Sequence, residues 1–150
     1  MPADARVEAA LAEGLNTLRS HGHFCDVSVQ DFRRWFRAET PYPDITMEDV
    51  VRNPFLVVHE IVEIDEVKKN GLGLEKDVII NNLERVDRAH LKAAKIEIDV
   101  ALAARNRKHI SERLKDIRAW SKDPLTGPEM RREYSELANR AARSLAKLKK

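Results

Sequence analysis

The sequence holds a single cysteine, Cys25, among 150 residues, so no disulfide can form within one chain. A chain of this length buries about two-thirds of the surface it exposes when unfolded, and it needs no disulfide to be stable. The lack of disulfides fits a reducing compartment. Because the first residues also lack the apolar stretch of a secretory signal, we expect a cytoplasmic protein.

Glycine and proline are scarce, with five and six residues respectively, which favours long helices over many short strands. The chain has no glycine-rich phosphate loop and no serine nucleophile elbow, so we exclude the enzyme classes that depend on them. Long apolar runs are also missing. The most apolar segment, residues 55–67, is too short and too acidic to cross a bilayer, so we expect no membrane partner.

The composition is typical of a globular protein, with 43% hydrophobic and 35% charged residues. The charged residues are unevenly distributed along the chain. Residues 44–66 carry seven acids and one base, whereas residues 105–150 carry fourteen lysines and arginines and six acids. The acidic middle can attract a cation, and the basic last third can attract a phosphate-bearing partner. The simpler alternative is that the basic helices are solvated surface.

Apolar residues recur at intervals of three and four along most of the chain, which predicts helices. Helix start signals stand at Ser28, Thr46 and Asn53-Pro54, and a stop signal at Asn70-Gly71. We expect helices over about 5–20, 54–69, 75–105 with a bend near 81–82, 110–120 and 128–148. We also expect a helix after the Ser28 cap with Phe32, Trp35 and Phe36 facing inward, and a short helix after the Thr46 cap with Val50 and Val51. We therefore predict an all-α, single-domain bundle of about six or seven helices spanning 1–150. Its long central helix would belong to a core at about 5–121, followed by a basic C-terminal helix at about 128–148.

The segment from Leu56 to Ile64 is apolar around most of the helix, and His59, Glu60 and Glu63 interrupt it. Residues three or four apart share a helix face, so both carboxylates lie on the histidine side of the helix. Charged groups buried among valine and isoleucine need a partner, a proton or a cation.

A second polar line lies on the long helix, where His90 and Glu97 share a face. The residues at 89, 93 and 94 are alanines, which allow another helix to approach closely. We predict that His59, Glu63, His90 and Glu97 supply two nitrogens and two carboxylates to a Zn²⁺, Mn²⁺ or Fe²⁺ ion.

An alternative without a metal stays open. On this interpretation Glu60 and Glu66 are exposed and pair with Lys68, Lys69 or a neighbouring arginine. His59 and His90 are then hydrogen-bonded core histidines. The spacing is neither H-E-x-x-H nor E-x-x-H, which excludes a zincin motif and a ferritin-like di-iron motif.

The run from Val57 to Glu63, V-V-H-E-I-V-E, resembles the motif helix of the HD-domain metal-dependent phosphohydrolases, where His-Asp is followed three residues later by Glu. Leu91 to Lys95 is similar to a Lys-Ala-Ala-Asp stretch of the nucleotidase branch. The resemblance covers roughly residues 15–105. It implies an all-helical fold, a bound divalent metal and hydrolysis of phosphate esters.

Carried over position by position, His59 matches the motif histidine and Glu63 matches the following glutamate. Glu60 stands where the family has aspartate, so this ligand is one methylene longer. The upstream histidine of the family would be His21 or His23.

The distal aspartate of the family is not matched. Lys95 occupies its place, which leaves Glu97 or Asp99 as substitutes on different helix faces. If the site is catalytic, the resemblance implies metal-assisted hydrolysis in which Glu60 or Glu63 takes a proton. Lys92 or Lys95 would steady the phosphate charge.

The basic last helix, residues 129–150, supports a second class of function. Its apolar stripe is nearly heptad-spaced and alanine-rich, so the helix either docks on a partner or RNA or packs within the domain. We thus predict a divalent-metal-binding protein that hydrolyses a nucleotide or another small phosphoester. The alternative is a non-enzymatic interaction or nucleic-acid-binding module, and the sequence leaves oligomer formation open in both cases.

Overall fold

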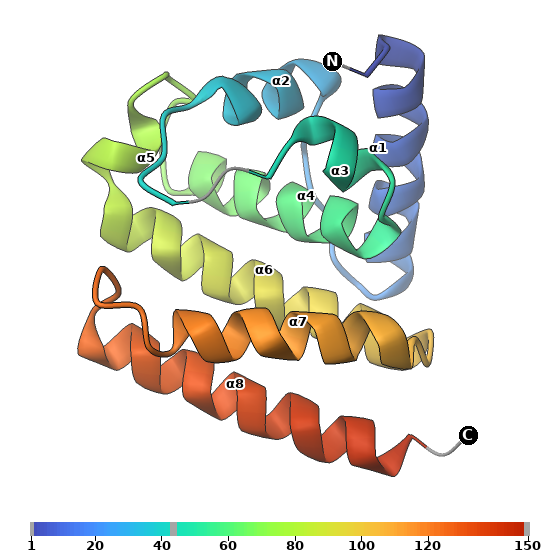
Figure 1. The fold of residues 1–150 in the computed structure, drawn as a ribbon. Helices are drawn as coiled ribbons and strands as arrows, with labels where there is room; N and C mark the ends of the chain where they lie inside the picture. Colours follow the sequence, from blue (N-terminus) through green and yellow to red (C-terminus); the bar gives the residue numbers. More distant parts are fainter. Residues whose placement is uncertain (1, 43–44, 149–150) are drawn as a thin grey trace.

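The computed structural model describes residues 2–42 and 45–148, and within them it has eight helices and no strand (Figure 1). The helices are α1 (Asp4–Ser20), α2 (Val29–Arg37), α3 (Met47–Val51), α4 (Pro54–Lys69), α5 (Val78–Asn81), α6 (Leu83–Ala103), α7 (Arg107–Trp120) and α8 (Pro128–Lys147). The all-α prediction is confirmed. Among these eight helices none is both long and apolar enough to span a membrane.

Side-chain caps set the helix ends that the sequence predicts. Ser28 and Asp31 form a complete capping box at α2. The Asn53 side chain accepts from the backbone N–H groups of Phe55 and Leu56 and so starts α4. At α3 only half of the predicted box forms, because the Thr46 hydroxyl accepts from Asp49 N–H but also donates to the Asp49 carboxylate.

The long helix expected from residue 75 is interrupted, and this break accounts for the larger number of helices. Asn82 adopts φ −140° and ψ 39°, outside the helical region, between α5 and α6. Its side-chain amide donates to the Val78 carbonyl over 2.9 Å. An asparagine side chain competes in this way with the backbone for a carbonyl, so the predicted bend is a full break.

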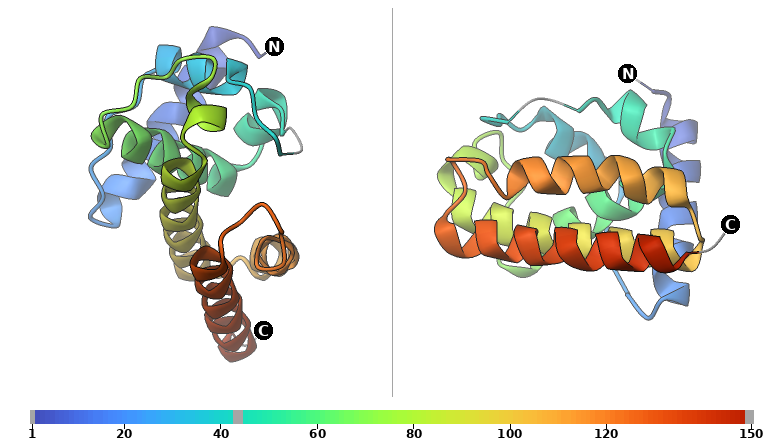
Figure 2. Two further views of the ribbon diagram at one scale, coloured as in Figure 1. Left: turned by 90° about the vertical axis from the view of Figure 1, so that its left-hand side faces the viewer. Right: turned by 60° about the horizontal axis from the view of Figure 1, so that its bottom comes forward.

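Helix α6 lies at the centre of the molecule, with α4 on one side and the α7–α8 pair on the other (Figures 1 and 2). Helix α1 crosses α4 closely at Gly14, where an added Cβ would lie 2.7 Å from Ile61 Cδ1. The absence of a side chain at Gly14 thus permits the close contact between α1 and α4.

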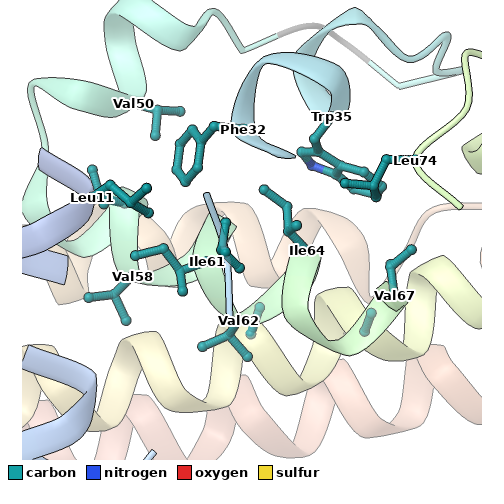
Figure 3. Packing of buried hydrophobic residues seen from close by; sticks show 14 of the residues in the cluster. Leu11, Phe32, Trp35, Val50, Val58, Ile61, Val62, Ile64, Val67 and Leu74 are labelled. Atoms are coloured by element: carbon teal, nitrogen blue, oxygen red, sulfur yellow. The ribbon is translucent and has the colours of Figure 1, made fainter. Parts of the chain in front are cut away.

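Two hydrophobic clusters flank α6. The first lies among α1 to α4 and one face of α6, and Figure 3 shows Phe32 and Trp35 of α2 above Ile61 and Ile64 of α4. The second joins the other face of α6 to α7 and α8. The apolar stripe of α8 belongs to this second cluster, with Met130, Tyr134, Leu137 and Ala141 buried. The stripe therefore packs inside the protein and is not a free docking face.

Candidate metal centre

Three polar side chains of α4 are buried between the two hydrophobic clusters. His59, Glu60 and Glu63 are 4%, 8% and 6% exposed, because α4 is covered by α1, α2, α3 and α6. A charged group at such depth is costly unless another group compensates it. The contacts of each side chain therefore decide what the cluster can do.

His59, Glu63 and His90 form a compact group of potential metal ligands. One atom from each side chain lies within 4.8 Å of the others, and His59 Nε2 is 3.6 Å from Glu63 Oε1. Two ligands of a tetrahedral ion, each about 2.0–2.1 Å from it, lie about 3.3 Å apart. Small side-chain rotations therefore bring this group to bonding distance.

The tautomer of His90 is fixed by its neighbours. The Tyr134 hydroxyl donates to Asp87 Oδ1 over 2.8 Å, and its oxygen lies 2.8 Å from His90 Nδ1. Because a hydroxyl has one proton, Nδ1 must donate to Tyr134, which leaves the lone pair on His90 Nε2. Burial lowers the pKa of His90 to about 4, so the ring is neutral at pH 7. This is the form of histidine that binds metals.

His59 is held between two carboxylates. Its Nδ1 lies 2.8 Å from Glu97 Oε1, and its Nε2 faces Glu63. Burial disfavours the charged ring, but the hydrogen bonds to Glu63 and Glu97 outweigh it and raise the pKa of His59 to about 10. Without a metal the ring carries both protons. A cation bonded to Nε2 would replace one of them, while Glu97 keeps the ring oriented.

Glu97, the fourth predicted ligand, lies apart from this group. It is 1% exposed, and both oxygens are occupied by His59, His109 and Arg113 at 2.6–3.0 Å. Burial opposes its ionisation, yet the hydrogen bonds from His109 and His59 hold the pKa of Glu97 well below its usual range. Seven residues separate it from His90, about 10.5 Å along a helix, so the two side chains reach opposite sides of the His59 ring.

Two further polar residues of the site, His109 and Arg113, carry no signal in the sequence that marks them. Both lie on α7, four residues apart, and Arg113 donates through Nε and Nη2 to the two oxygens of Glu97. Arg113 also lies 5.0 Å from the centroid of the Trp120 ring. In the sequence of α7 only the apolar residues recur with helical spacing. The contacts of His109 and Arg113 with Glu97 of α6 depend on how the two helices pack.

Glu60 is buried without complete hydrogen bonding. Burial, and after it the negative charge of Glu63, raises the pKa of Glu60 to about 8, so it holds a proton at neutral pH. Its Oε2 is the single buried side-chain oxygen or nitrogen in the described residues that has no hydrogen-bond partner. Such atoms are rare in folded proteins, so Glu60 is the one incompletely satisfied member of the buried cluster.

These side chains lie in the wall of a cavity of about 1210 Å³, a volume suited to a small organic molecule. His59, Glu60, Glu63 and His90 come from α4 and α6. The remaining wall comes largely from α2, from residues within 38–42 and 45–47, from α7 and the turn after it, and from Tyr134 of α8. The ligand group therefore faces a space that a substrate can enter.

The other residues singled out from the sequence lie elsewhere. The Lys92 ammonium pairs with Glu66 Oε2 at 2.8 Å and does not line the cavity. His21 and His23 lie in the turn after α1, and neither is part of the ligand group or the cavity wall.

Lys95, at the place of the family's distal aspartate, and Asp99, one of its two possible substitutes, both contact α8. Lys95 pairs with Glu133, and Asp99 pairs with Arg140.

Comparison of the chain with models of protein families, with curated proteins and with solved structures gives no match. The resemblance to HD domains thus remains a prediction carried by the residues of α4.

Proposed function

We propose that the protein binds one divalent metal ion through His59, Glu63 and His90 and uses it to hydrolyse a phosphoester. The observation that carries the proposal is the grouping of these three ligands within 4.8 Å beside a cavity of about 1210 Å³. Two imidazoles and one carboxylate suit Zn²⁺, Mn²⁺ or Fe²⁺ and leave coordination positions open.

The partners of the ligands support this assignment. Glu97 orients His59 through Nδ1, and Tyr134 orients His90 through Nδ1. Histidines that bind metals usually donate their second ring N–H to such a group. Nε2 is therefore the nitrogen left to bind an ion in each ring; in His90 it carries a lone pair, whereas in His59 the ion would have to replace a proton.

A divalent ion at this site would lower the pKa of a water molecule and polarise a phosphoryl oxygen. Glu60 is the proton acceptor in the proposed reaction. It adjoins Glu63 and faces the same cavity. The positive charge of the ion favours the ionised form of Glu60, which can then take the proton from the attacking water.

The choice of a phosphoester comes from the HD resemblance, whereas the choice of metal ligands comes from the geometry. The alternative function, nucleic-acid binding by the basic C-terminal helix, would use exposed side chains of α8, because its apolar stripe is buried. That function needs no metal, so metal dependence separates the two.

The test is hydrolysis of p-nitrophenyl phosphate and bis(p-nitrophenyl) phosphate by protein stripped with a chelator and reloaded with Mn²⁺, Co²⁺ or Zn²⁺. His90→Ala should lose both metal and turnover. Glu60→Gln should keep the metal but lose about 10²- to 10⁴-fold in rate, the usual contribution of a proton-transfer group. Glu136→Gln, at an exposed glutamate of α8, is the matched control and should behave as the wild type.

Turnover that persists in the chelated protein or in His90→Ala would contradict the proposal. Stoichiometric metal binding without hydrolysis of either ester would support the metal site and contradict the hydrolase activity.

A further inference from the structure

Aromatic side chains are concentrated around the cavity. The chain holds four phenylalanines, two tryptophans and two tyrosines. Five of these eight residues line the cavity, namely Trp35, Phe36, Tyr42, Trp120 and Tyr134. Ligand pockets are lined mainly by hydrophobic and aromatic side chains, with a few polar groups that fix the orientation of the ligand. The wall therefore suits a ligand with a flat, apolar part beside the group that the metal centre binds.

Burial separates the rings that fill the core from those that a ligand can reach. Trp35 and Tyr134 are 6% and 1% exposed and belong to the two hydrophobic clusters. Phe36, Tyr42 and Trp120 are only partly buried. A partly buried ring in the wall of a cavity leaves apolar surface in contact with water, and a ligand that covers this surface gains from its burial.

Trp120 adjoins the proposed metal centre. Arg113, Asp116 and Trp120 recur at intervals of three and four, so one face of α7 forms this side of the cavity. The centroid of the Trp120 ring lies 4.4 Å from that of His90, at an interplanar angle of 76°, and 5.7 Å from that of Tyr134. Edge-to-face contacts of this kind are favourable for aromatic rings. The indole is thus a fixed surface next to a metal ligand.

The indole ring is also held in place by the cation beside it. The Arg113 guanidinium lies over the ring, 5.0 Å from its centroid, and is itself bound to Glu97 and Asp116. His90, the other neighbour, is fixed by its hydrogen bond to Tyr134. The ring therefore needs no rearrangement to receive a ligand, and preorganisation of this kind strengthens binding.

The position of Trp120 limits the distance between the ring of a ligand and its phosphate. A phosphoryl group bound to an ion at His90 Nε2 has its ester oxygen close to the neighbours of His90, and Trp120 is one of them. An aromatic ring bonded directly to that oxygen would meet the indole. The base of a nucleotide, by contrast, is separated from its phosphate by a ribose.

We propose that the substrate is an aryl phosphate monoester, in which an aromatic ring is bonded directly to the phosphate oxygen, and that Trp120 binds this ring. The phosphate part of the inference rests on the proposed function, whereas the ring site does not. In the hydrolysis, the oxygen of water bonds to phosphorus, and the bond from phosphorus to the aryl oxygen breaks. The products are inorganic phosphate and a phenol, whose oxygen takes up a proton.

A phenol also suits the proton-transfer group of the site. Phenols have a pKa of about 10, as tyrosine does, so a phenolate leaves more readily than the alkoxide of an ordinary alcohol. Glu60 is the one group that the proposed reaction uses for proton transfer, and it acts on the water. A leaving group that needs no proton in the transition state therefore matches this arrangement.

The test compares two phosphonates that cannot be hydrolysed, because a CH₂ group replaces the ester oxygen. Benzylphosphonate carries a ring on this group, and ethylphosphonate carries a methyl group in its place. Calorimetric titration of the Zn²⁺-loaded protein gives the two dissociation constants. We expect benzylphosphonate to bind about tenfold more tightly, a difference that burial and stacking of one ring can supply.

Trp120→Leu should bring this ratio close to one, whereas Trp120→Phe, which keeps a ring, should retain most of it. Phe24→Leu is the matched control and should leave the ratio unchanged, because Phe24 is an exposed aromatic residue outside the cavity wall. The Zn²⁺ content of each variant is measured alongside, so that loss of the ion is not mistaken for loss of the ring site. Equal affinity for the two phosphonates in the wild type, or a ratio unchanged in Trp120→Leu, would overturn the proposal.

Binding of p-nitrophenol to the metal-free protein separates this inference from the proposed function. The two tryptophans give two indole N–H signals in a proton NMR spectrum, and the Trp120 signal is assigned by its absence in Trp120→Phe. We expect p-nitrophenol to shift this signal saturably, and by more than that of the buried Trp35. Such a shift supports the ring site even if the protein takes up no metal. An unshifted Trp120 signal would overturn the ring site and leave the metal centre to its own test.

Discussion

Two groups of buried polar side chains meet at His59, one on each side of its ring, and they differ in how completely they are hydrogen-bonded. On the Nδ1 side lies the closed network, which we define as Glu97, His109 and Arg113, where both oxygens of Glu97 are bonded. On the Nε2 side lies the open group, defined as Glu60, Glu63 and His90, where Glu60 Oε2 has no partner in the described structure.

The difference shows that burial alone does not identify a binding site. Glu97 is more deeply buried than Glu60, yet its environment compensates its charge and leaves nothing for a ligand to contact. A satisfied network holds the helices in place, and an unsatisfied group beside a cavity is available for chemistry. Variants on each side of His59 should therefore differ in their effects on stability and on metal binding.

The largest effect should come from the closed network. Glu97→Gln removes the buried carboxylate that Arg113 and His59 share and leaves Arg113 with the exposed Asp116 as its remaining ion-pair partner. Breaking a buried ion pair in this way costs about 3–5 kcal/mol of unfolding free energy. Urea denaturation measures the loss. The exposed control Glu136→Gln should change stability by less than about 0.5 kcal/mol. A loss below about 1 kcal/mol for Glu97→Gln would mean that the network does not hold α6 and α7 together.

The next effect belongs to the open group. Zn²⁺ or Mn²⁺ at 100 times its dissociation constant should stabilise the wild type by about 2.7 kcal/mol, because only the folded chain assembles the three ligands. The same ion should not stabilise His90→Ala. Thermal unfolding with and without the ion measures both. An equal shift in the two proteins would place the ion elsewhere.

A smaller effect should come from the hydroxyl that orients His90. Tyr134→Phe keeps the buried ring but removes the hydrogen bond to His90 Nδ1, and loss of such an orienting group lowers metal affinity about 10- to 100-fold. Competition with a chelator of known affinity measures the change. Tyr42→Phe, at the other tyrosine, is the control. Unchanged affinity in Tyr134→Phe would show that the His90 ring is held by packing alone.

The smallest effect has the opposite sign. In the chelated protein Glu60→Gln should raise the unfolding free energy by about 1 kcal/mol at pH 8, because it removes a buried carboxyl whose ionisation burial disfavours. Since the pKa of Glu60 rises from 4.5 to about 8 on folding, its contribution is most favourable below pH 4.5 and is lost as the pH rises to about 8. Stability curves of the two proteins should therefore diverge over this range. Parallel curves would contradict the raised pKa.

The sequence predicted the elements that depend on local signals. Helix caps at Ser28 and Asn53 are short-range hydrogen bonds, and the pairing of His59 with Glu63 follows from helical spacing. The break at Asn82 was foreseen only as a bend, because the side-chain bond to the Val78 carbonyl competes closely with helix continuation.

The parts that depend on tertiary packing were not accessible from one sequence. His90 and Glu97 share a face of α6, and on this basis the sequence predicts that both bind the same metal ion. Their separation of about 10.5 Å along the helix places them on different sides of His59, which becomes visible only when α4 is positioned. The contributions of His109, Arg113 and the cavity wall likewise require α7 to be in place.

The most direct test of the metal centre is the metal content of the purified, untagged protein, measured by elemental analysis beside His59→Ala and His90→Ala. The account predicts close to one Zn, Mn or Fe per chain in the wild type, or saturable uptake of one such ion after chelation, and loss in both variants. No uptake of any of these ions by a folded wild-type protein, or equal uptake by the variants, would contradict it.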